Sequence, residues 1–216
     1  HLSVLPVLIG PDDLVVMDHQ VHASVQLTCR ALAGLGTEVR DIPHNDIGRV
    51  REAAAEARAA GRTTWYLADG VYSMFGDTAP LSEVRAALDE FDALYVYFDD
   101  AHGVGWKGHR GIGHVLSGMG HHDRVVVIGS LAKSWGAGGA VVRLPTESMA
   151  EEILLAGATF TFSGPLHPAE LGAATAAAEI HLSSERDERA ARLMERIDRL
   201  RAGIAEAQLP ALSLER

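Results

Sequence analysis

The sequence predicts an α/β domain in which a mostly parallel sheet is flanked by helices. Apolar segments of strand length alternate with segments of helical periodicity along most of the 216 residues, and this alternation is typical of βαβ units. Residues 94–98 and 125–128 are continuous apolar runs, which indicates strands covered on both faces, as in a parallel sheet. Because such sheets bind ligands at the carboxyl ends of their strands, polar residues that follow these runs are the first candidates for a functional site.

The predicted elements of the first half lead up to Asp99. In chain order they are a short helix within residues 2–9, a strand at 14–17, a helix at 22–33, a half-exposed strand at 38–42, a helix at 46–60, a strand at 63–68, a helix at 81–91 and the strand at 94–98. Gly34 and Gly61 end two of these helices, because glycine readily adopts the left-handed conformation at a helix end. Pro6 weakens the first helix.

The second half continues the alternation and then becomes helical. Its predicted elements are the strand at 125–128, a strand at 140–144, a helix at about 146–156, a strand at 159–162, a helix at 167–183 and a helix at 185–208. The last helix is rich in Arg and Glu with i,i+4 pairs such as Glu185 with Arg189, which indicates a solvent-exposed face.

Composition excludes several classes of protein. Hydrophobic residues make up 47% and charged residues 22% of the chain, as in ordinary globular domains, and no apolar run approaches the roughly 18 residues of a membrane span. The net charge of -10 argues against nucleic-acid and anionic-membrane partners. Cys29 stands alone, so an internal disulfide is excluded. With no signal peptide either, we expect a cytoplasmic protein.

Two residues at predicted strand ends suggest a cofactor. Asp99 ends the strand at 94–98, and Lys133 follows the strand at 125–128. A lysine can hold an aldehyde as a Schiff base, and an aspartate can keep a ring nitrogen protonated, so the pair points to pyridoxal 5'-phosphate (PLP). An isolated Asp is more often a strand-end cap and an isolated Lys an exposed loop residue, so this interpretation depends on their combination.

Four motifs, in order along the chain, resemble those of the α-oxoamine synthases, a family of PLP-dependent enzymes. They are His-Ala-Ser at 22–24, Ser-Met-Phe-Gly-Asp-Thr-Ala-Pro-Leu at 73–81, Asp-Asp-Ala-His-Gly at 99–103 and Ser-Leu-Ala-Lys at 130–133. The resemblance covers roughly residues 2–170. It implies the large domain of a fold-type I PLP-dependent transferase, similar to aspartate aminotransferase, at residues 1–170, with residues 171–216 as a helical segment leading toward a small domain that is absent from this chain.

The resemblance also implies a catalytic group. Lys133 would hold the cofactor and act as the base at the substrate α-carbon, while Asp99 would bond the pyridine nitrogen. The ring of His22 would lie over the cofactor ring, and His102 would lie near the phenolic oxygen.

Three serines complete the implied cofactor site. Ser73 would lie near the phenolic oxygen, and Ser130 would bind the phosphate. Ser163 resembles a residue that family dimers lend to the phosphate of the partner subunit. The resemblance therefore implies a homodimer with its site at the subunit interface.

The activity implied is condensation of an amino acid with an acyl thioester, carried by CoA or an acyl carrier protein, with decarboxylation to an α-amino ketone. Two alternatives stay open, namely an aminotransferase or aldolase-type lyase of the same fold, and an inactive fragment. Asp69 stands where the family usually has a glutamate, and Phe75 replaces a usual acid. Both departures are compatible with an unusual acyl donor.

Two further patterns do not predict sites. Residues 103–108 match G-x-G-x-x-G after a strand, but they make a poor helix start, and the next strand ends in Gly129-Ser130 where a dinucleotide site needs an acid. The histidines between residues 102 and 122 lack the spacings of zinc sites, so we expect no metal.

Overall fold

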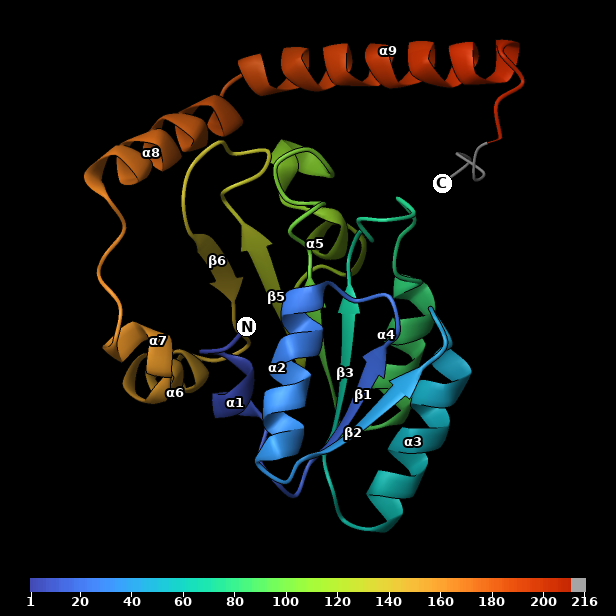
Figure 1. Ribbon diagram of the computed structural model, residues 1–216, viewed down its shortest axis with the longest axis vertical. Coiled ribbons are helices and arrows are strands. Elements are labelled where there is room, and N and C mark those ends of the chain that lie inside the picture. The colour runs from blue at the N-terminus through green and yellow to red at the C-terminus, as the bar shows by residue number, and fades with distance from the viewer. Residues whose placement is uncertain (211–216) are drawn as a thin grey trace.

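The computed structural model describes residues 1–210, and a six-stranded sheet with the order β2-β1-β3-β4-β5-β6 lies at its centre (Figure 1). All neighbouring strands are parallel except β5 and β6, which are antiparallel. This confirms the predicted α/β fold with a mostly parallel sheet. The strands are β1 (Leu14–Asp18), β2 (Glu38–Ile42), β3 (Thr64–Asp69), β4 (Leu94–Asp99), β5 (Val125–Ser130) and β6 (Ala140–Arg143).

Helices cover both faces of the sheet (Figure 1). One face packs against α3 (Ile47–Ala59), α4 (Leu81–Glu90) and α5 (His114–Met119), and the other against α1 (Leu5–Leu8), α2 (Ala23–Gly34) and α6 (Glu147–Ala156). Because successive strand residues point to opposite faces, Phe98 packs on the first side and Tyr97 on the second. Each fully buried side chain of this size contributes about 1.5–3 kcal/mol.

Three predicted helix starts are confirmed by side-chain caps. The His22 ring caps α2 by accepting from the Ser24 N–H, Asp46 caps α3 through the Arg49 N–H, and Thr146 caps α6 through the Met149 N–H. Such a cap satisfies a backbone donor that has no partner inside the helix. The cap at His22 also fixes where its ring can lie at the end of β1.

One predicted strand is wrong. Residues 159–162 alternate Thr with Phe, yet they form α7 (Ala158–Thr161), a helical turn in which no side chain is buried. The Phe162 N–H donates to the Ala158 carbonyl, and the sheet order places no strand beside β6 other than β5. Without a neighbouring strand the amides bond locally, so the alternation of side chains has no face to bury.

The chain ends in two exposed helices, α8 (Pro168–Leu182) and α9 (Glu185–Glu206), which extend away from the sheet (Figure 1). Neither contains a buried residue. They are attached where the His181 ring stacks on Trp135 with centroids 4.5 Å apart and Arg186 donates to backbone carbonyls near residue 107. Nowhere in residues 1–210 is there a helix with both the length and the apolar character needed to cross a bilayer.

Candidate active site

The carboxyl edge of the sheet carries a cavity of about 310 Å³. The strand order reverses between β1 and β3, because β2 lies on one side of this pair and β4, β5 and β6 on the other. Doubly wound sheets bind ligands at such a switch point. The residues with chemical function that line the cavity are His1, His22, Ser24, Asp99, Ser130 and Lys133. The sheet thus brings together four of the predicted site residues.

Asp99 forms the buried end of β4 and is 6% exposed. One carboxylate oxygen, Oδ1, accepts from the Ala101 N–H at 3.0 Å, and the other, Oδ2, lies 3.1 Å from His1 Nε2. Burial by itself raises the pKa of this carboxyl, but the His1 bond, the Ala101 N–H and the Lys133 charge outweigh it and lower the pKa. Asp99 is therefore an ionised carboxylate on the cavity wall at neutral pH.

His1 is a site residue that sequence analysis missed. Its Nδ1 lies 2.8 Å from the Tyr97 hydroxyl, and its side chain is 14% exposed. Tyr97 and Asp99 are two residues apart on β4 and so share a face of the sheet. His1 reaches them through the fold alone, 98 positions from Asp99, and no local pattern marks such a contact.

Lys133 lies on the loop between β5 and β6. Ser130 ends β5, and its Oγ accepts from the Ala132 N–H at 3.2 Å, which turns the chain toward Lys133. The loop closes where the Leu131 N–H donates to the Gly139 carbonyl, with Gly139 at a φ of 87° that favours glycine. The Lys133 ammonium acts on other groups of the site, since its charge lowers the pKa values of Asp99 and His102.

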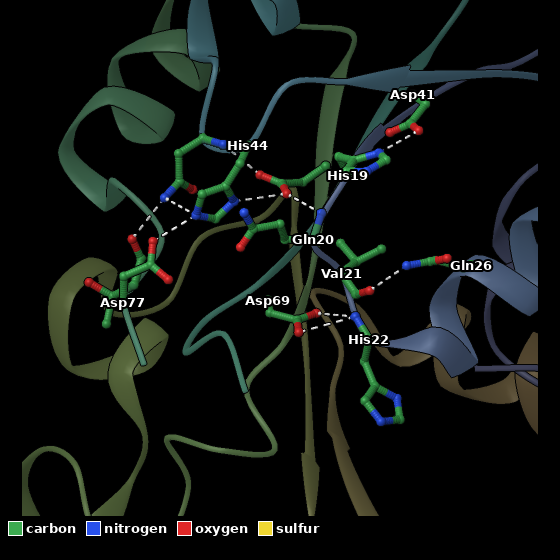
Figure 2. Close-up of polar contacts among 12 residues, drawn as sticks. His19, Gln20, Val21, His22, Gln26, Asp41, His44, Asp69 and Asp77 are labelled. Atoms are coloured by element: carbon green, nitrogen blue, oxygen red, sulfur yellow. Dashed lines mark hydrogen bonds and ion pairs between the residues drawn. The ribbon is translucent and has the colours of Figure 1, made fainter. Parts of the chain in front are cut away.

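His22 and Asp69 bridge the switch point. The backbone N–H of His22 donates to both oxygens of Asp69 at 3.2 Å, while its ring points away from that carboxyl (Figure 2). Burial, and after it the charge of Asp99, raises the pKa of Asp69 to about 8. The β3–β4 register places Asp69 and Asp99 side by side, so one carboxyl keeps its charge and the other its proton. Asp69, which is shorter than the glutamate usual in the family, thus binds the backbone at the start of α2.

Asp100 points away from the cavity into a cradle of glycines. Its Oδ2 accepts from the Val115 N–H at 3.0 Å, and burial raises its pKa to about 7. A Cβ at Gly70, Gly103 or Gly113 would overlap the Asp100 carboxyl. The segment that contains Gly103 forms turns and leads only into a three-residue 3₁₀ helix, His109–Gly111, which is not the long helix that a dinucleotide-binding loop opens.

The three remaining predicted residues, Ser73, His102 and Ser163, do not line this cavity. His102 is half-buried, and burial, followed by the Lys133 charge, lowers its pKa, whereas Asp99 raises it. Ser73 is exposed and lines a neighbouring cavity of about 410 Å³, which His22 also lines. Ser163 is exposed, and its hydroxyl donates to the Thr159 carbonyl. Ser163 lies outside both cavities, so its role in a partner subunit stays a prediction.

With this geometry established, comparison with known proteins decides the family. The sequence model of the family described as aminotransferase class I and II matches residues 2–215. The chain belongs to this family. It is 35% identical to an 8-amino-7-oxononanoate synthase of Dechloromonas aromatica over 95% of this chain, and 34% identical to one of Mycolicibacterium smegmatis over 98%. The predicted resemblance to the α-oxoamine synthases is thereby confirmed.

Solved structures agree with the sequence comparison. Serine palmitoyltransferase of Sphingomonas wittichii superposes with a TM-score of 0.82 at 26% identity, over 95% of this chain and 49% of that one. The enzyme of S. paucimobilis, solved with a bound PLP–myriocin adduct, gives 0.81 at 25% identity, over 95% of this chain and 51% of that one. These neighbours confirm the predicted fold type. The chain spans about half the length of the curated relatives that it matches, 52% and 54% for the two synthases.

Proposed function

We propose that this protein is a PLP-dependent α-oxoamine synthase, which condenses an amino acid with an acyl thioester to form an α-amino ketone and releases carbon dioxide and the free thiol. The observation that carries the proposal is the pairing of a buried, ionised Asp99 with Lys133 on the wall of one cavity. The curated relatives named above support the same reaction class. An aminotransferase or lyase of this fold shares the Asp and the Lys, but lacks the combination of motifs at 73–81 and 99–103.

The residues of the cavity fit PLP. Its volume of about 310 Å³ is at the lower end of small-molecule sites, and its wall offers an amine, a carboxylate and a hydroxyl for the aldehyde, the ring nitrogen and the phosphate. Asp99 Oδ2, which lies 3.1 Å from His1 Nε2, is the oxygen that would bond the ring nitrogen, since Oδ1 already accepts from the Ala101 N–H. The ring nitrogen of PLP would either share Oδ2 with His1 or replace His1 as the partner of Oδ2. When bound, PLP supplies an electron sink for the charge that develops at the substrate α-carbon.

Each of five side chains would have its own role in the proposed reaction. Lys133 would hold the cofactor through its aldehyde, and its Nζ would move the proton of the substrate α-carbon. Asp99 holds the proton on the ring nitrogen, because an ionised buried carboxylate stabilises the adjacent cation. The ring of His22 would orient the cofactor ring, and the backbone N–H of His22 is held by Asp69. Ser130 would bind the phosphate at the end of β5, and His102 would act near the phenolic oxygen.

We extend the proposal to the assembly. Residues 1–170 form the large domain, residues 171–216 lead toward a small domain, and two copies pair in the cytoplasm so that Ser163 serves the partner's phosphate. Exposed apolar side chains near Ser163 support an interface, with Phe162 at 88% and Leu171 at 59% exposure. Residues 211–216 lie outside the described residues. CoA or an acyl carrier protein would carry the acyl group.

Covalent labelling tests the cofactor site directly. The chain contains two lysines, Lys107 and Lys133, so reduction of the PLP-loaded protein with borohydride, followed by peptide mapping, has two possible outcomes. We expect the label on Lys133, and we expect Lys133→Ala to lose the visible absorbance of bound PLP and all formation of amino ketone. Lys107→Ala is the matched control and keeps both. A label on Lys107 would refute the site, and loading without condensation of any amino acid and acyl thioester would refute the reaction.

A further inference from the structure

A histidine outside the cavity lies between two carboxylates (Figure 2). His44, in the turn between β2 and α3, has Nδ1 3.0 Å from Asp18 Oδ1 and Nε2 2.6 Å from Asp77 Oδ2. Asp18 ends β1 and is fully buried, whereas Asp77 belongs to the loop after β3. The ring therefore joins the end of a central strand to a loop that is 33 residues away from His44 in sequence.

The neighbour of His44 strengthens the same junction. The backbone N–H of Asn45 donates to Asp18 Oδ2 at 2.7 Å, and its side-chain amide donates to the Thr78 carbonyl at 3.2 Å. Asn45 has a φ of 56°, a left-handed conformation that Asn tolerates better than most residues. The Tyr72 ring meets His44 edge to face with centroids 4.4 Å apart. Two consecutive residues thus attach one loop to β1.

That loop is the one that carries Ser73. Its base is closed by the bridge between Val71 and Thr78 and by the Tyr72 N–H, which donates to the Asp77 carbonyl at 2.9 Å. Its tip is exposed, with Met74 at 84%, so few packing contacts hold it. Within residues 1–210, Asp77 Oδ1 is buried without a hydrogen-bond partner, which leaves the His44 bond as the main constraint on that side chain.

The loop matters because of what it faces. Tyr72 and Ser73 line the cavity of about 410 Å³ that is also lined by His22, and His22 in turn lines the cavity of Asp99 and Lys133. Through this arrangement, the distance between Ser73 and the ring of His22 depends on where Asp77 is held. His44 itself lines neither cavity, so any effect that it has on the site passes through the residues that it bonds.

We propose that His44 is a positioning residue, which bonds Asp18 with one ring nitrogen and Asp77 with the other and so holds the Ser73 loop against His22. This inference rests on the proposed function, in which Ser73 and His22 both face the cofactor. It adds a residue to that function, since the motifs used to recognise the family did not include His44.

The bridge depends on protonation, because both partners of the ring are acceptors and a neutral imidazole has one N–H. Burial lowers the pKa of His44, but the bonds to Asp77 and Asp18 outweigh it and raise the pKa. The other titratable groups that face this cluster are Tyr72 and Tyr66, whose pKa values burial raises, so both stay neutral. In the folded protein the protonated ring makes both bonds, and their contribution to stability is complete below the pKa of an unfolded histidine, roughly 6.5. As pH rises through the raised pKa of His44 in the folded state, the ring loses a proton and with it one bond.

Two substitutions separate positioning from stability. The amide nitrogen of Gln reaches about as far as His Nε2, and that of Asn about as far as Nδ1. His44→Gln therefore keeps the bond to Asp77 and loses the one to Asp18, and His44→Asn does the reverse. Both remove one buried bond, so their melting temperatures should fall together. Asp77→Asn weakens the loop bond directly, and Asp41→Asn is the matched control, because Asp41 accepts from His19 at 2.8 Å on the surface.

The readouts are loop cleavage and kinetics, in the PLP-loaded protein expressed as its gene encodes it. We expect chymotrypsin to cut after Met74 or Phe75 at least about tenfold faster in His44→Asn and Asp77→Asn than in the wild type, the effect of one lost charged bond. We expect kcat to fall by a similar factor with KM less changed. His44→Gln and Asp41→Asn should stay close to the wild type. The melting-temperature difference between the wild type and the two single-bond variants, His44→Asn and His44→Gln, should shrink as pH rises past the pKa of His44, because the neutral ring keeps one N–H.

Equal cleavage and equal kcat in His44→Asn and His44→Gln would overturn the inference, as would values for Asp77→Asn that match those of Asp41→Asn. Changes in cleavage rate and kcat that only follow the loss of melting temperature across the variants would also overturn it. A wild-type protein that binds no PLP would instead refute the proposed function, and the cleavage comparison would still decide whether His44 anchors the loop.

Discussion

Replacing Asp99 by Asn removes one charge from the cavity and leaves the shape of the side chain almost unchanged. The Ala101 N–H needs an acceptor, so the Asn oxygen should stay in the position of Oδ1, which is 3.0 Å from that nitrogen. The amide NH2 then occupies the position of Oδ2, which is 3.1 Å from His1 Nε2, and Asp99 and His1 both line the cavity. A donor thus replaces an acceptor at the place proposed for the ring nitrogen, and that nitrogen loses its proton.

The structure sets the size of the effect. A hydrogen bond to a charged group is worth about 1.5–3 kcal/mol, and since about 1.4 kcal/mol is a factor of ten, losing one costs roughly 10- to 150-fold. Asp99 is nearly buried, so water cannot replace the lost charge. We therefore expect kcat of Asp99→Asn to fall by at least this factor, while PLP still binds through Lys133 and KM changes less.

The assay follows thiol release from an acyl thioester together with amino-ketone formation, at saturating amino acid. Asp100→Asn is the matched control, because it is the same substitution one residue further along, on a side chain that accepts from the Val115 N–H and faces away from the cavity. It should change the melting temperature more than kcat. Near-wild-type kcat in Asp99→Asn, or an equal loss in Asp100→Asn, would refute the reasoning.

Two further predictions concern stability. The pKa of Asp69 is raised to about 8 from 3.8, so the folded state binds a proton that the unfolded state has lost, and stability falls as pH rises between these values. Asp69→Asn should remove this dependence of stability on pH. A melting-temperature difference between the variant and the wild type that stays constant from pH 5 to pH 8 would contradict the prediction. A Cβ at Gly103 would lie 2.8 Å from the backbone nitrogen of His114 and overlap the Asp100 carboxyl. Gly103→Ala should therefore lower the free energy of unfolding in urea by about 1–3 kcal/mol or more. Gly172→Ala, in open space on α8, is its control and should be neutral or stabilising; equal stability of the two variants would show that the cradle can relax.

The parts of the site that could be predicted are those that local patterns mark. Asp99 was found because it ends a continuous apolar run, and Lys133 because it closely follows one; such runs form the buried strands β4 and β5. His22 and Ser130 were implied by the resemblance of the motifs at 22–24 and 130–133, and both lie at strand ends, His22 after β1 and Ser130 at the end of β5. For these residues, strand direction alone brings the side chains to one edge, since parallel strands end on the same side of a sheet.

The parts that were missed depend on long-range contacts. His1 meets Asp99 over a separation of 98 residues, and His44 meets Asp18 and Asp77 over separations of 26 and 33 residues. Residues 159–162 were predicted as a strand because their pattern suits one, but a strand needs a neighbour and the sheet ends at β6. In each case the deciding partner is remote, and a single sequence does not state which remote segments will be adjacent.

The sequence by itself therefore determined the α/β class, the strand ends that bear Asp99, Ser130 and Lys133, and the motifs that place the chain in its family. These follow from hydrophobic periodicity and short spacings, which act within a few residues. Only the tertiary structure decided that Asp69 would keep a proton while Asp99 keeps its charge, and that His44 would join β1 to the Ser73 loop. Ionisation and anchoring depend on burial and on neighbouring charges, and both exist only after the strands have found their order in the sheet.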